Sequence, residues 1–416
     1  MSEGDSTSRR AIAVTVFVAA LGYFVDIYDL LLFTIVRVKS LQDLGVSPQQ
    51  SLDTGLELLS VQMWGLLAGG LAWGVLGDKK GRLSVLFGSI LLYSLANLAN
   101  AFVQSVEAYR ALRFVAGIGL AGELGAAVTL VSEIMPARSR GYGTAVVAGV
   151  GLLGAVAAAL VGRNLSWRTA YVIGAVLGFM LLALRLRMFE SGMYDKVRDG
   201  DARRGDVMML LHPPARLFKY LRCILIGIPI WYVVGILVGS APEFGKAFHA
   251  PGALRSPSEI TPGDAVLFTY VGLVLGDLTS GFLSQAVGSR RKVVAAFLAL
   301  TAALVGVYLT LDAPSNTTFY AVCGAMGFGI GYWAVFVTVG AEQFGTNLRA
   351  TVATSVPNFV RGSVPLLTAG FKYLRNGRHL SIVQSAAVLG VVCVTIAAAS
   401  LWGLDETHGK ELDYLE

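Results

Sequence analysis

The feature that most constrains the fold of this chain is a series of long apolar runs that recurs along the whole sequence. A helix needs about 20 apolar residues to cross the hydrocarbon core of a bilayer. Roughly twelve runs reach that length: 11–36, 54–77, 83–103, 108–135, 141–162, 168–187, 217–240, 263–287, 293–311, 318–341, 350–373 and 380–404. The pattern predicts an all-α membrane protein that crosses the bilayer many times.

The composition agrees with this class. Hydrophobic residues make up 55% of the chain and charged residues 14%, whereas soluble domains carry about 25% charged residues. The net charge of +6 comes from Lys and Arg in short loops between apolar runs, which is typical of membrane topology rather than nucleic-acid binding. Cys223, Cys323 and Cys393 lie in apolar runs, so neither a disulfide framework nor a cysteine metal site is expected. The first apolar run is too long for a signal-peptide core, and we expect it to be retained.

One long polar insertion divides the runs into two sets of six. It occupies 188–216, so we expect an N-terminal six-helix bundle at 1–187 and a C-terminal bundle with a short tail at 217–416. Lys and Arg are enriched in the segments that are cytoplasmic if the N-terminus is inside. Both termini and the central loop are therefore expected in the cytoplasm, and the compact loops fit a bacterial inner membrane.

Two pairs of similar segments reveal an internal repeat. GVLGDKKGR begins at Gly74 and GFLSQAVGSRR at Gly281, while SEIMPARSRG resembles AEQFGTNLRA. The second pair places Glu133 and Arg140 in correspondence with Glu342 and Arg349. The offsets agree to about two residues, so the two bundles are expected to be pseudo-symmetric copies. Transporters with such repeats bind substrate near the bilayer midplane, between the repeats.

Two carboxylates interrupt the first apolar run. Asp26 and Asp29 lie in ALGYFVDIYDLLLFTIV and share one face of a helix, because they are three residues apart. An acid at this depth is costly and usually faces a cavity, a partner or a proton path. The alternative is a polar spot packed against a neighbouring helix.

The loop after the second run resembles the signature of the major facilitator superfamily, G-x-L-x-D-K/R-x-G-R. Gly74, Asp78, Gly81 and Arg82 match it. The resemblance implies two six-helix bundles, alternating access and a latch at the cytoplasmic ends, with Glu133, Arg140, Glu342 and Arg349 as further latch residues. The second copy carries Gln285 where the acid would stand.

Other segments resemble the branch of sugar porters, phosphate:proton symporters and organic-ion transporters. The matches are RFVAGIGLAGE with Arg113 and Glu123, the tail DETHGKELDYLE, and GYFVDIYDL, which is most similar to the phosphate symporters. Glu123 is followed by Leu-Gly-Ala-Ala instead of Tyr-Pro-Leu-Ser, and the Gln and Asn clusters that bind sugars are absent from the run 141–162. A polyol substrate is therefore not expected.

The resemblance gives several acids a role. It implies that Asp29 is the proton site, that Arg113 is its partner, and that Glu123 corresponds to the helix-4 acid of phosphate symporters. If Arg113 moves, Asp29 can take a proton in one conformation and release it in the other. The alternatives are a static ion pair between Asp29 and Arg113 and an interhelical hydrogen bond for Glu123. Asp26 could be a second proton site or a substrate contact.

Arg361, inside the run 350–373, is the most informative residue about the substrate. A buried cation needs an anion, which is either an acid such as Asp277 or Asp26, or the substrate itself. Guanidinium suits bidentate binding of carboxylate or phosphate, so we expect an anionic substrate, with Asn358 one turn away as a hydrogen-bonding partner. Asp277 is expected to contact substrate or to act as a conformational latch.

Aromatic residues in three runs complete the expected substrate site: Tyr28, Trp231, Tyr232, Tyr332 and Trp333. The resemblance to sugar porters favours the last two, and packing against other helices or lipid is the alternative for each. Glycines in the run 318–341, including Gly327 and Gly331, are expected to allow bending and close packing.

These features predict a secondary active transporter that carries a small anionic metabolite together with protons. An enzyme is not expected, because the histidines lie in loops or tails and no Walker motif is present. The expected partners are protons, a small-molecule substrate and lipid; no cofactor, metal or nucleic acid is expected, and the protein is expected to be a monomer. The alternatives are a transporter of organic cations that uses Asp26 and Asp29, and a membrane sensor that transports nothing.

Overall fold

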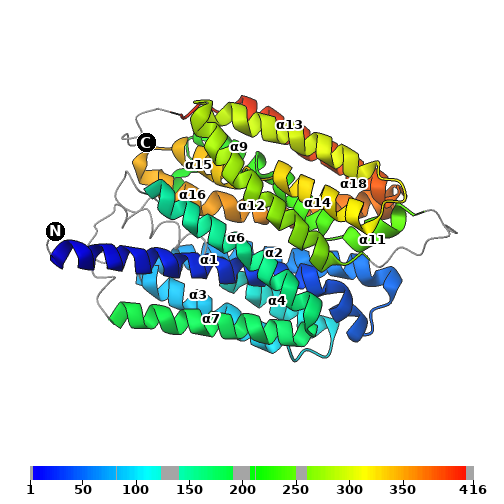
Figure 1. Cartoon of the computed structure of the whole chain (residues 1–416), viewed down its shortest axis with the longest axis horizontal. Coiled ribbons are helices and arrows are strands. Elements are labelled where there is room, and N and C mark those ends of the chain that lie inside the picture. Colours follow the sequence, from blue (N-terminus) through cyan, green and yellow to red (C-terminus); the bar gives the residue numbers. More distant parts are fainter. Residues whose placement is uncertain are drawn as a thin grey trace. The chain divides into compact units, whose positions relative to one another are not determined.

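The computed structural model describes residues 3–80, 82–122, 140–190, 207–210, 212–249 and 260–408. Every regular element in those ranges is a helix, which confirms the all-α prediction (Figure 1). The elements up to the central polar segment are α1 (Glu3–Asp43), α2 (Pro48–Lys80), α3 (Arg82–Asn100), α4 (Val106–Leu120), α6 (Arg140–Asn164), α7 (Trp167–Glu190) and η1 (Val207–Leu210). The later elements are α9 (Pro214–Leu225), α10 (Ile228–Trp231), η2 (Tyr232–Val238), α11 (Ala241–Ala247), α12 (Pro262–Ala286), α13 (Arg290–Leu309), α14 (Asn316–Gly329), α15 (Trp333–Glu342), α16 (Thr346–Arg361), α17 (Val364–Lys372), η3 (Tyr373–Gly377) and α18 (Ile382–Trp402).

The helices coincide with the apolar runs of the sequence. α12, for example, begins and ends within one residue of the predicted run 263–287. Within the described ranges, 8 helical segments are long and apolar enough to cross a membrane, counting α9, α10 and η2 as one segment and α14 with α15 as another. The protein is therefore an integral, multi-pass membrane protein.

Contacts divide the chain into two compact units. Unit 1 comprises Met1–Leu32 and Trp64–Arg203, and unit 2 comprises Phe33–Met63 and Arg204–Glu416. The end of α1 and the first half of α2 therefore pack with unit 2, although the predicted six-helix bundles assign them to the N-terminal half. The division into bundles at 1–187 and 217–416 stays a prediction.

Within unit 2, α12 and α14 approach each other at the level of their backbones. A methyl group at Gly327 would overlap the carbonyl oxygen of Thr269, and one at Gly276 would overlap the carbonyl oxygen of Phe328. Glycine at such positions lets membrane helices pack closely enough to gain dispersion energy along their length. The close packing predicted for this part of the run 318–341 is confirmed.

Three apolar runs of unit 2 are interrupted in their interior. The run 217–240 changes from α10 to the π-helical segment η2, the run 318–341 breaks between α14 and α15, and the run 350–373 breaks between α16 and α17. In the last case the cause is Pro365, which has no N–H to donate to the carbonyl of Arg361 four residues earlier. Irregular backbone at membrane depth is tolerated where it is buried in protein or lines a cavity.

Candidate functional site

The two acids of α1 lie in the buried part of unit 1. Asp26 is 0% and Asp29 1% exposed. Asp29 lies directly against α7, because a methyl group at Gly174 would overlap its Oδ1 atom. The neighbouring Tyr28 hydroxyl donates to the carbonyl of Ala170, also on α7, at 2.9 Å. The acid-bearing segment of α1 thus packs on a short stretch of α7 that is free of bulky side chains at Gly174.

Arg113 of α4 belongs to the same cluster. It is 0% exposed, and its Nη1 atom donates to the hydroxyl oxygen of Tyr171 at 3.3 Å. The guanidinium carbon lies 6.0 Å from the centre of the Tyr171 ring. The hydroxyl groups of Tyr171 and Tyr109 share a further hydrogen bond of 2.7 Å. Arg113 therefore binds Tyr171, which is itself hydrogen-bonded to Tyr109.

Asp29 interacts with Arg113 electrostatically, without a hydrogen bond between the two side chains. It interacts electrostatically with Asp26 and Arg113, and the amide of Asn97 lies beside it. Neither of its oxygens makes a hydrogen bond of ordinary geometry within the described part of the chain, and none forms an ion pair with Arg113. The structure brings the predicted proton site and its predicted partner into one cluster, but in this conformation they are not a salt bridge.

Arg361 lies at the interruption of the helix pair α16 and α17 in unit 2. It is the last residue of α16 and 1% exposed. Its guanidinium carbon is 6.0 Å from the centre of the Trp333 ring, a cation–π distance. The buried Asn358 lies one turn earlier on the same helix. The partial negative charge at the C-terminal end of α16 also favours a cation at this position.

Asp277 of α12 binds the first turn of α15. Its Oδ1 atom accepts a hydrogen bond from the N–H of Ala334 at 2.8 Å, and the N–H of Trp333 also hydrogen-bonds to its carboxylate. Within the described residues it makes no ion pair with Arg361. A carboxylate suits the N-terminus of a helix, whose first N–H groups have no partner inside the helix. Asp277 thus fixes the start of α15 and with it Trp333.

The three interrupted helices of unit 2 meet close to Arg361. The Tyr332 hydroxyl donates to the carbonyl of Ile226, just before α10, at 3.0 Å. A methyl group at Gly227 would come within 2.9 Å of Phe336 in α15 and 2.8 Å of Val360 in α16. The interruptions between α9 and α10, between α14 and α15, and between α16 and α17 therefore lie in one region of unit 2.

The other aromatic residues predicted to bind substrate in unit 2 are Trp231, at the end of α10, and Tyr232, at the start of η2. Both are buried, and the Tyr232 hydroxyl donates to the carbonyl of Ala386 at 2.7 Å. Both side chains lie in the packed interior of unit 2, and the hydrogen bond connects Tyr232 to α18.

Much of the predicted cytoplasmic latch lies outside the described residues. This applies to Gly81 and Glu133, and to the side chains of Asp78, Arg82 and Arg140, whereas the backbone of Gly74 belongs to α2. Glu123, which was predicted as a proton site and not as a latch residue, also lies outside the described residues. In the second half, Glu342 forms an ion pair of 2.6 Å with Arg290 at the start of α13. Arg349 lies in the first turn of α16, three positions after Thr346, where the helix begins.

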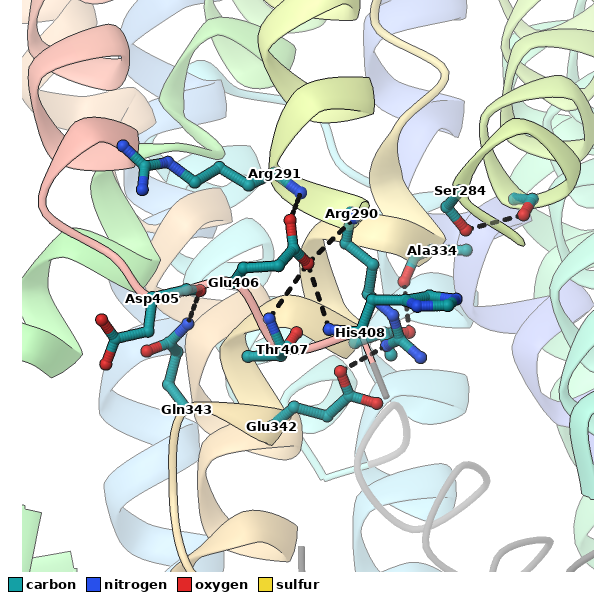
Figure 2. A network of polar contacts seen from close by, with 12 residues as sticks. Ser284, Arg290, Arg291, Ala334, Glu342, Gln343, Asp405, Glu406, Thr407 and His408 are labelled. Atoms are coloured by element: carbon teal, nitrogen blue, oxygen red, sulfur yellow. Dashed lines mark hydrogen bonds and ion pairs between the residues drawn. The ribbon is translucent and has the colours of Figure 1, made fainter. Parts of the chain in front are cut away.

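A second carboxylate at the start of α13 is that of Glu406, which lies in the tail after α18. Sequence analysis did not single out this residue. The Glu406 carboxylate accepts hydrogen bonds from the Ser289 hydroxyl and from the N–H groups of Arg290 and Arg291 at 3.1 and 3.2 Å (Figure 2). The N–H groups of Thr407 and His408 bind it as well, each at 3.0 Å. Burial acts to raise the pKa of Glu406, but these hydrogen bonds lower it to about 2. The tail thus supplies a carboxylate near the position where Gln285 replaces the acid of the motif.

Sequence analysis also missed Asn97, Tyr109 and Tyr171. Each is a polar side chain in an apolar run, which is the signal that identified Asp29. Tyrosine carries an apolar ring, however, so its presence in such a run does not distinguish a hydrogen-bonding role from packing.

Comparison with known proteins agrees with this architecture. The model of the Major Facilitator Superfamily matches residues 12–369. The niacin transporter of Acinetobacter baylyi is 26% identical over 95% of this chain and 94% of its own length. The gentisate transporter of Corynebacterium glutamicum is 26% identical over 83% of this chain and 77% of its own. The crystal structure of a D-xylose–proton symporter has a TM-score of 0.67 at 16% identity, covering 96% of this chain and 100% of that one. The chain belongs to the Major Facilitator Superfamily.

Proposed function

We propose that this protein is a secondary active transporter that carries a small carboxylate on an aromatic ring together with protons. The observation that carries the proposal is the position of Arg361. It is a buried guanidinium beside an indole ring, at the point where three interrupted helices of unit 2 meet.

The chemistry of this position suits an organic anion. Guanidinium presents parallel N–H donors that match a carboxylate, and such a pair is strong where water is excluded. Asp277 binds the α15 backbone instead of Arg361. Trp333 offers a flat apolar face next to the cation, suited to a substrate with a ring as well as a charge. Interrupted helices form substrate sites in many transporters.

The names of the relatives support the same substrate class. Niacin and gentisate, the substrates named for the two related transporters, are each a carboxylate on an aromatic ring. The sequence alone left carboxylate and phosphate as possible anions, and the proposal narrows the substrate to a carboxylate on an aromatic ring.

Proton coupling follows from the cluster in unit 1. In the proposal Asp29 takes up the proton, and Arg113 controls how tightly Asp29 holds it. Asp26 and Glu123 are further proton sites. Protons that travel with the anion reduce the charge that crosses the membrane, where the potential costs about 2.3 kcal/mol per charge per 100 mV. The transporter would be a monomer in a bacterial inner membrane, with both termini cytoplasmic.

A transporter of organic cations is the second candidate, favoured by the two buried carboxylates Asp26 and Asp29. In that case Asp26→Asn abolishes binding of a cation such as tetraethylammonium, and Arg361→Ala leaves that binding intact. A ligand sensor instead binds substrate and never moves it across a membrane.

The test is calorimetric binding to the purified protein, with nicotinate, benzoate, cyclohexanecarboxylate, phosphate and tetraethylammonium as ligands. We expect the aromatic carboxylates to bind and Arg361→Ala to weaken them about a hundredfold, because it leaves the carboxylate without its partner. Trp333→Leu should reduce the preference for benzoate over cyclohexanecarboxylate. Arg378→Ala, at an exposed arginine, is the matched control. Unchanged binding of aromatic carboxylates to Arg361→Ala, or binding of the cation alone, contradicts the proposal.

A further inference from the structure

We infer that Tyr171 is a positioning residue of the proton switch: its hydroxyl holds Arg113 away from Asp29, so that Asp29 can carry a proton. The inference rests on the proposed proton-coupled transport and assigns a role to a residue that the proposal does not use. The juxtaposition behind it is the hydrogen bond from Arg113 to Tyr171, next to the α7 surface that receives Asp29.

Asp29 packs against the same face of α7 on which Tyr171 lies. Asp29 abuts Gly174, which is three positions after Tyr171 and therefore on the same side of the helix. Tyr171 interacts electrostatically with both Asp29 and Arg113. Two of the oxygen groups that interact with Arg113 thus lie in one cluster, the Tyr171 hydroxyl and the Asp29 carboxylate, and in this conformation Arg113 donates a hydrogen bond to the hydroxyl.

The choice of partner decides the charge that Asp29 can hold. A buried carboxylate is costly when it is ionised and lacks a paired cation. With Arg113 on Tyr171, the neutral acid is the favoured form and Asp29 keeps a proton taken from water. When Arg113 turns to Asp29, the carboxylate is stabilised and the proton leaves to water on the side that is then open.

Tyr109 strengthens the position of Tyr171. Its hydroxyl is 2.7 Å from that of Tyr171, and its ring meets the Tyr171 ring edge to face at 6.0 Å. Trp167 packs against both rings, so the Tyr171 side chain is held by aromatic neighbours on α4 and α7. A fixed hydroxyl is a better partner for Arg113 than a mobile one, because less ordering entropy is lost when the bond forms.

Other groups around Asp29 also affect whether it holds a proton. Among the described residues, the titratable and charged side chains that face it are Asp26 and Tyr28 on α1, Arg113 on α4 and Tyr171 on α7, with the neutral Asn97 on α3. Asp26 favours the neutral form of Asp29 by charge repulsion and does not depend on Tyr171. Removal of the Tyr171 hydroxyl therefore changes the competition for Arg113 and leaves the repulsion between Asp26 and Asp29 in place.

The test is an infrared pH titration of the carboxyl band of the purified protein without substrate, with the Asp29 band assigned by its loss in Asp29→Asn. We expect Tyr171→Phe to move the midpoint to lower pH by about one unit, a tenfold loss of proton affinity, because a hydrogen bond to a charged group has roughly that value. Tyr109→Phe should give a smaller shift in the same direction, and it serves if Tyr171→Phe fails to fold. Tyr220→Phe, a buried tyrosine bonded to Ser355 in unit 2, is the control and should not shift the band.

The outcomes separate this inference from the proposed function. If the Asp29 band titrates at the same pH in wild type, Tyr171→Phe and Tyr109→Phe, or moves to higher pH, the inference is overturned and proton coupling through Asp29 survives. If the band shifts as expected but aromatic carboxylates do not bind, the proposed substrate fails and the role of Tyr171 stands. If no band depends on Asp29, both are overturned.

Discussion

The Nη2 atom of Arg37, near the end of α1, donates hydrogen bonds to both carboxylate oxygens of Glu243 in α11, at 2.8 and 2.7 Å. The side chains are 4% and 21% exposed. The two residues are 206 positions apart, close to the spacing of the internal repeat, so they occupy corresponding places in the two halves of the sequence. Both residues lie in unit 2, where the pair connects the end of α1 to α11.

We predict a strong coupling between Arg37 and Glu243. Glu243→Gln should leave the buried guanidinium poorly compensated and lower the melting temperature by several degrees. A double-mutant cycle with Arg37→Gln should give an interaction free energy of about 1–3 kcal/mol. The comparison is Asp53→Asn, which removes the more exposed ion pair of Asp53 and Arg375, 3.1 Å apart. We expect this change to lower the free energy of unfolding by less than about 1 kcal/mol. Additive effects of the Arg37 and Glu243 variants would contradict this prediction.

Glu406 should make the stability of the protein depend on acid pH. Its pKa is lowered from the ordinary 4.5 to about 2 in the folded protein. The folded state therefore binds this proton less tightly than the unfolded state, and the stabilisation is complete above pH 4.5 and is lost as the pH falls toward 2. Glu406→Gln should melt at a lower temperature than wild type at pH 7, and the difference should shrink below pH 4.5.

Asp405→Asn is the matched control for Glu406→Gln, because Asp405 is the exposed neighbour whose backbone carbonyl, rather than its side chain, binds Gln343. It should melt as wild type does at neutral pH. A constant difference between wild type and Glu406→Gln from pH 7 to pH 3 would show that the hydrogen bonds of this carboxylate do not stabilise the fold.

Gly174 should be required for the position of Asp29. Gly174→Ala places a methyl group where the Asp29 carboxylate lies, so we expect a loss of about 1–3 kcal/mol from overpacking and impaired proton coupling. Gly149→Ala is the control, since a methyl group there meets no atom within 4 Å and alanine favours a helix by up to about 1 kcal/mol. Wild-type coupling in Gly174→Ala would mean that Asp29 need not pack against α7.

The sequence predicted the helices well because long apolar runs leave the backbone few alternatives in a bilayer. It predicted the interruptions less well. Pro229, Gly329, Gly331 and Pro365 are visible in the sequence, but membrane helices often contain Gly and Pro without breaking. Which of them interrupts a helix depends on partners supplied by other helices, such as the Asp277 carboxylate that binds the start of α15.

The candidate site was predictable only where a charge lies in an apolar run. That signal identified Asp29, Arg113 and Arg361, each of which is buried. It did not indicate that Arg113 binds Tyr171, since this contact spans 58 positions. The contact of Arg37 with Glu243 is equally invisible, because both residues lie at the ends of runs, where charged residues are common and need no special explanation.

Proton-coupled transport of an organic anion is tested most directly in proteoliposomes that contain a trapped pH dye. Nicotinate, gentisate, phosphate, glucose and tetraethylammonium would be added in turn, without an imposed proton gradient. We predict that the lumen acidifies on addition of an aromatic carboxylate, and that Asp29→Asn and Arg361→Ala abolish the signal while Arg378→Ala retains it. Absence of acidification with every anion, together with uptake of tetraethylammonium alone, would contradict anion symport and favour transport of cations.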